Sequence, residues 1–116
     1  LLFRAPGTHW SFAKLDEAGC VTEVSEKVRI SDYASVGLYY FKSVELFRDA
    51  YRRLARVIKQ QYREVYVMPL YRVLLEDGKL IGSRVISSSE VIALGTPNEV
   101  LRIDPDFLKH NCGAKS

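Results

Sequence analysis

Hydrophobic and polar positions alternate in two short stretches near the start of the sequence. Residues 10–15, WSFAKL, and residues 21–27, VTEVSEK, each show the alternation that predicts a β-strand. The intervening DEAG is turn-like, so the two strands are predicted to form a β-hairpin. Val21 and Val24 break the strict period of two, which indicates a β-bulge or a strand with two apolar faces.

A nearly continuous apolar and aromatic run follows at residues 36–41, VGLYYF. Runs of this kind are typical of strands buried on both faces, and we predict a central strand here. The preceding stretch, residues 28–35, is polar and irregular.

The hydrophobic period then changes to three and four residues, which predicts a helix over about residues 43–62. Ser43 suits its N-cap. The predicted inward stripe consists of Val44, Phe47, Tyr51, Leu54, Ile58 and Gln61. A second helix is predicted within residues 66–78, starting near Met68-Pro69 and ending at Gly78.

The last third of the chain is predicted to hold two short strands and a helix. The strands cover residues 79–86 and 90–94. Thr96 suits an N-cap and Pro97 a first helical position, so a helix is expected from Pro97 to about Ile103. We divide the chain into a domain at residues 1–103 and a tail at residues 104–116 that is partly frayed.

These elements predict an α/β or α+β fold, with a partial mixed sheet and two main helices. The 116 residues correspond to one domain, and 47% of them are hydrophobic. No apolar stretch approaches a membrane span and no signal peptide is visible. Cys20 and Cys112 lie far apart without metal spacing, so we expect a cytoplasmic protein without a disulfide framework.

The pair Glu26-Lys27 is the first candidate for chemistry. A carboxylate beside an ammonium at a strand end can bind a sugar phosphate, because the carboxylate accepts from hydroxyls and the ammonium meets the phosphate. The alternative is an exposed ion pair on an edge strand, which is the commoner case for isolated charge pairs.

Six basic residues between Arg48 and Arg63 form a second candidate, since such a helix face could follow a phosphate backbone. The alternative is a solvated face with pairs Glu45–Arg48, Asp49–Arg52 and Asp49–Arg53. The net charge is only +3 and no aromatic residue is interleaved on that face. We therefore expect no nucleic-acid binding.

No metal or catalytic motif is recognisable. His9 and His110 stand at opposite ends of the sequence, and no cysteine or carboxylate completes a metal site by spacing. Cys20 has no basic neighbour in sequence that would lower its pKa. The residues alone therefore predict only a soluble α/β domain with a weak candidate anion site.

The ordered set of stretches adds a resemblance. HWSFAKLDEAGCVTEVSEK, ISDYASVGLYYFKS, EVYVMPLYRVLLEDGK and LGTPNEV together resemble the C-terminal half of sugar-phosphate nucleotidylyltransferases. The resemblance covers about residues 8–102 and is strongest to bacterial proteins found with capsule and surface-polysaccharide genes. It implies a doubly wound nucleotidyltransferase fold that joins a nucleoside triphosphate to a sugar 1-phosphate with magnesium. In that family the nucleotide loop and a metal-binding aspartate belong to the N-terminal half, which precedes the matching stretch.

Five residues take an expected substrate-binding role from this resemblance. Glu26 and Lys27 match the family's Glu-Lys pair, which contacts sugar and phosphate. Gly37 matches the glycine that lines the sugar pocket, and Glu64 and Tyr66 match the family stretch Asn-Gly-Glu-Phe-Tyr. The resemblance implies no catalytic or metal-binding residue in this chain.

Several positions depart from the family pattern. Tyr62 and Arg63 stand where Asn and Gly are usual, and Arg72 replaces an Asn. Ala93 stands where many members carry a metal-binding aspartate, and no proline closely follows Lys27.

Three hypotheses follow for the whole chain. It is the sugar-phosphate-binding half of a nucleotidylyltransferase-like fold that does not catalyse alone, or a catalytically inactive module that associates with itself or with a protein partner. The motive for the second is the bare sheet edge of a half domain, which a homodimer would cover. Nucleic-acid binding ranks last.

Overall fold

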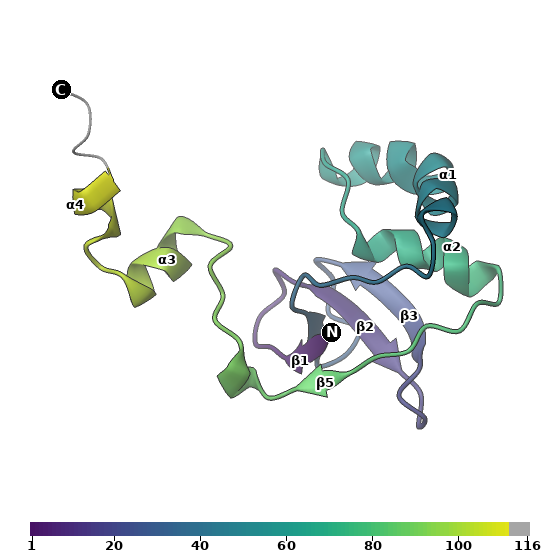
Figure 1. Cartoon of the computed structure of the whole chain (residues 1–116), viewed down its shortest axis with the longest axis horizontal. Helices are drawn as coiled ribbons and strands as arrows, with labels where there is room; N and C mark the ends of the chain where they lie inside the picture. The colour runs from purple at the N-terminus through teal and green to yellow at the C-terminus, as the bar shows by residue number, and fades with distance from the viewer. Residues whose placement is uncertain (112–116) are drawn as a thin grey trace.

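The computed structural model describes residues 1–111, and its centre is a five-stranded mixed sheet (Figure 1). The strands are β1 (Leu2–Arg4), β2 (Ser11–Leu15), β3 (Val21–Glu26), β4 (Tyr33–Ser35) and β5 (Val85–Ile86). Their order is β3-β2-β4-β1-β5. Only the β1–β5 pair is parallel. The predicted α/β class with a partial mixed sheet is confirmed, although most neighbours are antiparallel.

The predicted hairpin is present as β2 and β3. Its turn is closed by Asp16, whose carboxylate accepts from the backbone N–H groups of Ala18 and Cys20. The register shifts between Lys14 and Leu15, which agrees with the predicted bulge. The shift brings both Val21 and Val24 into the buried core.

Two helices lie on one side of this sheet, with the second between the first and the strands (Figure 1). Helix α1 spans Val44–Tyr62, and the side chain of Ser43 accepts from the Leu46 N–H as the N-cap. A 3₁₀ turn, η1 (Met68–Leu70), leads into α2 (Tyr71–Glu76), so the predicted second helix begins as a tighter turn. The core between sheet and helices includes Ala13, Val24, Ala50, Ile58, Leu70 and Val73.

The predicted stripe of α1 is only partly correct. Ala50 and Ile58 are its buried residues, whereas Val44 and Tyr51 are exposed. The exposed Gln61 also lies off the core. The helix packs mainly against η1 and α2 rather than on the strands, so only a narrow line around Ala50 and Ile58 is buried.

The opposite face of the sheet carries a smaller core. Phe3, Ala5, Phe12 and Ala34 are buried there, and loop residues such as Trp10, Ile30 and Val91 pack against them. Trp10 meets Phe3 edge to face, with ring centroids 5.2 Å apart. Adjacent residues Phe12 and Ala13 of β2 thus serve opposite faces, as the alternation of a strand requires.

The predicted central strand at residues 36–41 is wrong. The sheet strand is β4, which lies in the stretch that looks irregular in sequence, and residues 36–41 belong to no strand. The apolar run is used instead for packing against α2, with Phe41 stacked on Tyr71 at 4.7 Å between ring centroids. Leu38 and Tyr40 are 66% and 77% exposed.

The two later strand predictions are also largely wrong. Of residues 79–86, only β5 at the end joins the sheet, and Gly82 makes one isolated bridge to Cys20. Residues 90–94 form no strand; the 3₁₀ turn η2 (Ser88–Glu90) precedes an irregular stretch. Both stretches lack a neighbouring strand to pair with along most of their length.

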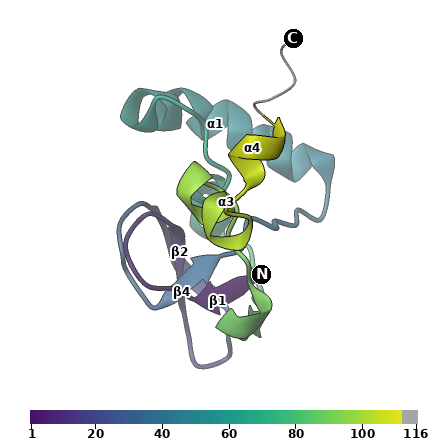
Figure 2. The same ribbon diagram turned by 90° about the vertical axis from the view of Figure 1, so that its left-hand side faces the viewer.

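The C-terminal part forms an arm that extends away from the sheet (Figure 1), and in the view from that side α3 and α4 lie in front of the other elements (Figure 2). It contains α3 (Pro97–Ile103), as predicted, and α4 (Phe107–Asn111). The radius of gyration is 16.7 Å, against about 13 Å for a compact domain of this length. None of the helices in residues 1–111 is long and apolar enough to cross a membrane.

Candidate anion site at the end of strand β3

Glu26 is a buried carboxylate at the end of β3. It lies opposite Ser11 in the β2–β3 register, and the Ser11 hydroxyl donates a short hydrogen bond to Glu26 Oε2. Its other oxygen, Oε1, accepts from Lys27 Nζ at 3.0 Å. Only 1% of the Glu26 side chain is exposed, and inside the protein Lys27 supplies its counter-charge while Ser11 satisfies its second oxygen with a hydrogen bond.

Lys27 turns the chain sharply after β3. Its φ is 60°, a left-handed conformation that is uncommon for a residue with a side chain. Its backbone N–H donates to the Trp10 carbonyl at 3.0 Å, and its ammonium donates to the His9 carbonyl at 3.3 Å. These contacts hold the backbone in place and direct the ammonium to the surface, where 45% of the side chain is exposed.

Tyr66 completes the surroundings of this ammonium. Lys27 Nζ lies 4.6 Å from the centroid of the Tyr66 ring, a cation–π contact. The Tyr66 hydroxyl donates to Glu64 Oε1 at 2.5 Å. Burial by itself lowers the pKa of Lys27, but the hydrogen bond and charge of Glu26, together with Tyr66, raise that pKa above its ordinary value. Lys27 is therefore a cation at neutral pH.

The turn after α1 brings Glu64 and Tyr66 to the strand end. Arg63 caps the helix with a φ of 66°, the left-handed conformation common at a helix C-terminus. The resemblance expects glycine at this position, and the positive φ explains that preference. Tyr62, where the family usually has Asn, donates from its hydroxyl to the Glu26 carbonyl at 3.2 Å.

Four of the five predicted site residues thus come together, and Gly37 does not join them directly. Its N–H donates to Ser35 Oγ at 3.0 Å, and its φ of 90° is a conformation that glycine adopts most easily. Ser35 is buried and follows Ala34, which pairs with Phe12 beside Ser11. Polar residues therefore occupy neighbouring positions across the sheet, in a row from buried Glu26 through half-buried Ser11 to buried Ser35.

Sequence patterns alone did not single out Ser11, Ser35 or Tyr62. One sequence signal could have identified Ser11. This serine lies two positions before Ala13 in a strand, so its side chain points to the same face as buried Ala13 although it is polar. Such a residue needs a buried partner, and Glu26 is that partner for Ser11.

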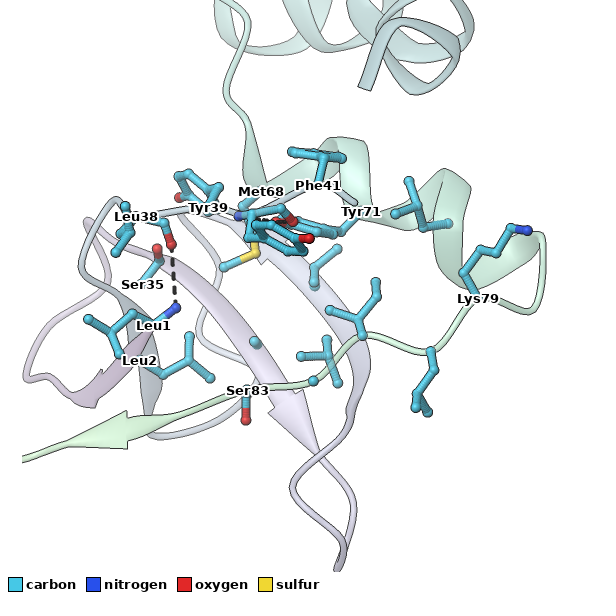
Figure 3. A pocket seen from close by; sticks show the side chains of 18 of the residues that line it. Leu1, Leu2, Ser35, Leu38, Tyr39, Phe41, Met68, Tyr71, Lys79 and Ser83 are labelled. Carbon is cyan, nitrogen blue, oxygen red and sulfur yellow. Dashed lines mark hydrogen bonds between the residues drawn. The ribbon is translucent and has the colours of Figure 1, made fainter. Parts of the chain in front are cut away.

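A separate cavity of about 590 Å³ lies between the sheet, α2 and the segments around residues 38–42 and 79–83. Figure 3 shows Leu2, Leu38, Met68 and Tyr71 among its mostly apolar walls. Ser35 lines it, whereas Lys27 and Tyr66 do not. The cavity therefore meets the polar row only at its Ser35 end.

The remaining candidates are accounted for by other contacts. Arg53, on the basic face of α1, pairs with Asp49 at 3.3 Å and Asp77 at 2.7 Å, so the predicted Asp49–Arg53 pair is present. His9 lies 3.7 Å from Glu99. No three metal-binding side chains gather within the described residues. The His110 side chain and Cys112 lie outside the description.

Comparison with known proteins gives one informative match. The crystal structure of the nucleoside-diphosphate-sugar pyrophosphorylase from Vibrio cholerae RC9 superimposes with a TM-score of 0.76 and 38% sequence identity. The match covers 87% of this chain and 43% of the Vibrio chain. This chain therefore spans less than half of the protein it resembles. No protein-family model and no curated protein matches it.

Proposed function

We propose that this chain is the sugar-phosphate-binding half of a nucleotidylyltransferase-like fold and does not catalyse nucleotidyl transfer by itself. The observation that carries the proposal is the Lys27 ammonium, which is fixed by buried Glu26 and reaches the surface beside Tyr66 and Glu64. The match to part of the Vibrio pyrophosphorylase supports the nucleotidylyltransferase-like fold in this proposal.

In this proposal two residues contact the ligand, Lys27 and Glu64, and a third, Glu26, holds Lys27 in place. Lys27 meets the phosphate, because it is the partly exposed cation of the site. Glu26 is too buried to receive sugar hydroxyls, so its role is to hold the ammonium. The exposed carboxylate of Glu64 is placed to accept from a hydroxyl of the same ligand.

Catalysis is not assigned to these residues. Phosphoryl transfer depends on positioning and on metal ions that neutralise developing charge. Because the described residues include no cluster of three metal-binding side chains, we derive no magnesium-dependent step from this chain. The capsule and surface-polysaccharide type and a cytoplasmic site of action belong to the same proposal.

A thermal-shift titration against sugar 1-phosphates tests the proposal, because a ligand that binds the native state raises the melting temperature. Wild type is compared with Lys27→Ala and with Lys14→Ala, which removes an exposed lysine elsewhere on the hairpin. Each ligand is used with and without magnesium and nucleoside triphosphates.

A shift with a sugar phosphate in wild type and Lys14→Ala that disappears in Lys27→Ala is the expected result. An unchanged shift in Lys27→Ala would remove Lys27 from the site. No shift with any ligand would overturn the sugar-phosphate function as a whole.

A second candidate function is association with another protein chain, first of all a second copy. It is favoured by large apolar side chains on the surface, including Leu38, Tyr40, Leu80 and Ile92. Sedimentation equilibrium at micromolar concentration tests self-association, and a clean monomer would count against it.

A further inference from the structure

The segment from Leu38 to Lys42 has the alternation of a β-strand although it belongs to no sheet. Leu38, Tyr40 and Lys42 are exposed, whereas Tyr39 and Phe41 are half-buried against α2. The Tyr39 and Phe41 rings lie 6.1 and 4.7 Å from the Tyr71 ring. In an extended chain, successive side chains point to opposite faces, and this pattern is the one observed.

One edge of this segment is occupied. The Leu38 carbonyl accepts from the Leu1 nitrogen at 3.4 Å (Figure 3). Both backbone groups of Tyr40 bond to the Tyr71 hydroxyl. The Leu38 carbonyl and both backbone groups of Tyr40 are therefore directed toward the start of β1 and toward α2.

The other edge is open. Within the described part of the chain, no group hydrogen bonds to the backbone N–H or C=O of Tyr39 or of Phe41. These two residues alternate with the occupied ones, as the two edges of a strand do. A row of open donors and acceptors at a spacing of two residues is a template for another strand.

We infer that this open edge pairs with the same edge of a second copy, antiparallel about a two-fold axis through Tyr40. In this register Tyr39 of one copy exchanges both hydrogen bonds with Phe41 of the other, and Phe41 with Tyr39. All open groups at these two residues are then satisfied by their own counterparts. The inference rests on the second candidate function and specifies its surface.

The side chains of the segment suit this self-pairing. No charged residue occurs from Tyr33 to Phe41, so like charges do not meet at the centre. The two Tyr40 residues form a non-hydrogen-bonded pair, in which aromatic side chains stabilise antiparallel strands. Lys42 lies opposite Leu38 of the other copy and away from its own counterpart.

Disulfide trapping tests this register in the full chain. Cys20→Ser and Cys112→Ser remove the natural thiols, and Tyr40→Cys is added. Opposed Cα atoms in a non-hydrogen-bonded antiparallel pair are about 4.5 Å apart, which a disulfide can bridge. The matched control is Leu38→Cys, two residues away and similarly exposed, whose counterpart would lie about 13 Å distant.

Under mild oxidation, most of the Tyr40→Cys chain is expected to become a covalent dimer and the Leu38→Cys chain to stay monomeric. Mixing Leu38→Cys with Lys42→Cys chains is expected to restore cross-linking. Circular dichroism of each variant checks that it is folded.

Two results would overturn the inference and separate it from the other proposals. A wild-type dimer by sedimentation without Tyr40→Cys cross-linking places the contact elsewhere and leaves self-association standing. A monomer at all concentrations overturns both. Neither result bears on the sugar-phosphate site, because Lys27 is not in this surface.

Discussion

The hydroxyl of Tyr71 hydrogen bonds to both backbone groups of Tyr40. It accepts from the Tyr40 N–H at 3.0 Å and donates to the Tyr40 carbonyl at 2.7 Å. A side chain thus takes the place that a neighbouring strand would have. Burial of the phenol raises the pKa of Tyr71, which keeps this donor protonated at neutral pH.

Tyr71→Phe is therefore expected to destabilise the protein. It leaves two backbone groups of Tyr40 without their partner, which costs about 1–3 kcal/mol. Urea denaturation measures the loss, and hydrogen exchange should become faster at residues 38–42. Tyr51→Phe is the control, since no hydrogen bond of its hydroxyl occurs among the described residues. Equal stabilities for the two variants would contradict this account.

Lys27→Gly and Lys27→Ala should differ in stability although both remove the ammonium. The φ of 60° is easy for glycine and strained for alanine. We expect the glycine variant to be more stable by about 1 kcal/mol, measured by urea denaturation. Neither variant should bind a sugar phosphate. If alanine were the more stable, the left-handed conformation at this position would be in doubt.

Ser11→Ala is expected to weaken both the fold and the site. It removes the hydroxyl that donates to buried Glu26, at a cost of about 1–3 kcal/mol. Glu26 is then no longer held in place beside the Lys27 ammonium, so the thermal shift with a sugar 1-phosphate should become smaller. Ser25→Ala, which removes an exposed hydroxyl bonded to the Val28 carbonyl, is the comparison for a serine outside this row. An unaltered shift in Ser11→Ala would separate Ser11 from ligand binding.

The pair of Lys27 and Glu26 should stabilise the fold in a pH-dependent way. The pKa of Lys27 is raised in the folded protein, so its contribution is complete below its ordinary value of 10.5 and is lost as the pH rises through the folded pKa. The difference in unfolding free energy between wild type and Lys27→Met should stay constant from about pH 7 to 9 and shrink at higher pH. A difference that grew with pH would have the wrong sign.

Thr96→Ala should act locally. Thr96 and Glu99 form a capping box at the start of α3, and loss of such a cap costs about 1 kcal/mol of helix stability. Because the arm extends away from the sheet, the main unfolding transition should stay unchanged while amide exchange in α3 becomes faster. A matching fall in global stability would show that the arm folds cooperatively with the sheet.

Sequence patterns predict the elements whose signals are local. The hairpin is predicted by two alternating stretches around Asp16. Helix α1 is predicted by a long run of apolar residues spaced three and four apart and by the N-cap at Ser43. The exit of α2 at Gly78, with a φ of 70°, is also a local property. Each of these needs only neighbours within a few positions.

The misassigned elements depend on partners far along the chain. The run VGLYYF has the composition of a buried strand, but strand pairing needs a second strand, and here Tyr71 satisfies the backbone of Tyr40 instead. Strand β4 is short and polar in sequence, yet it pairs with β1 and β2. The hydrophobic pattern within either segment carries no information about a partner far along the chain.

The candidate site could also be predicted only in part. The family pattern identified Glu26, Lys27, Glu64 and Tyr66, which lie together. It did not indicate that Glu26 is buried, because burial depends on Ser11 from the other strand and on Tyr62 from α1.

The extended arm also has a consequence for how this molecule moves in solution. A body of 55 × 31 × 25 Å experiences more friction than a sphere of equal mass. On a sizing column a single chain will therefore elute early and imitate a larger species. Mass-based methods such as light scattering or sedimentation equilibrium are needed to count copies, and NMR relaxation should reveal anisotropic tumbling along the arm.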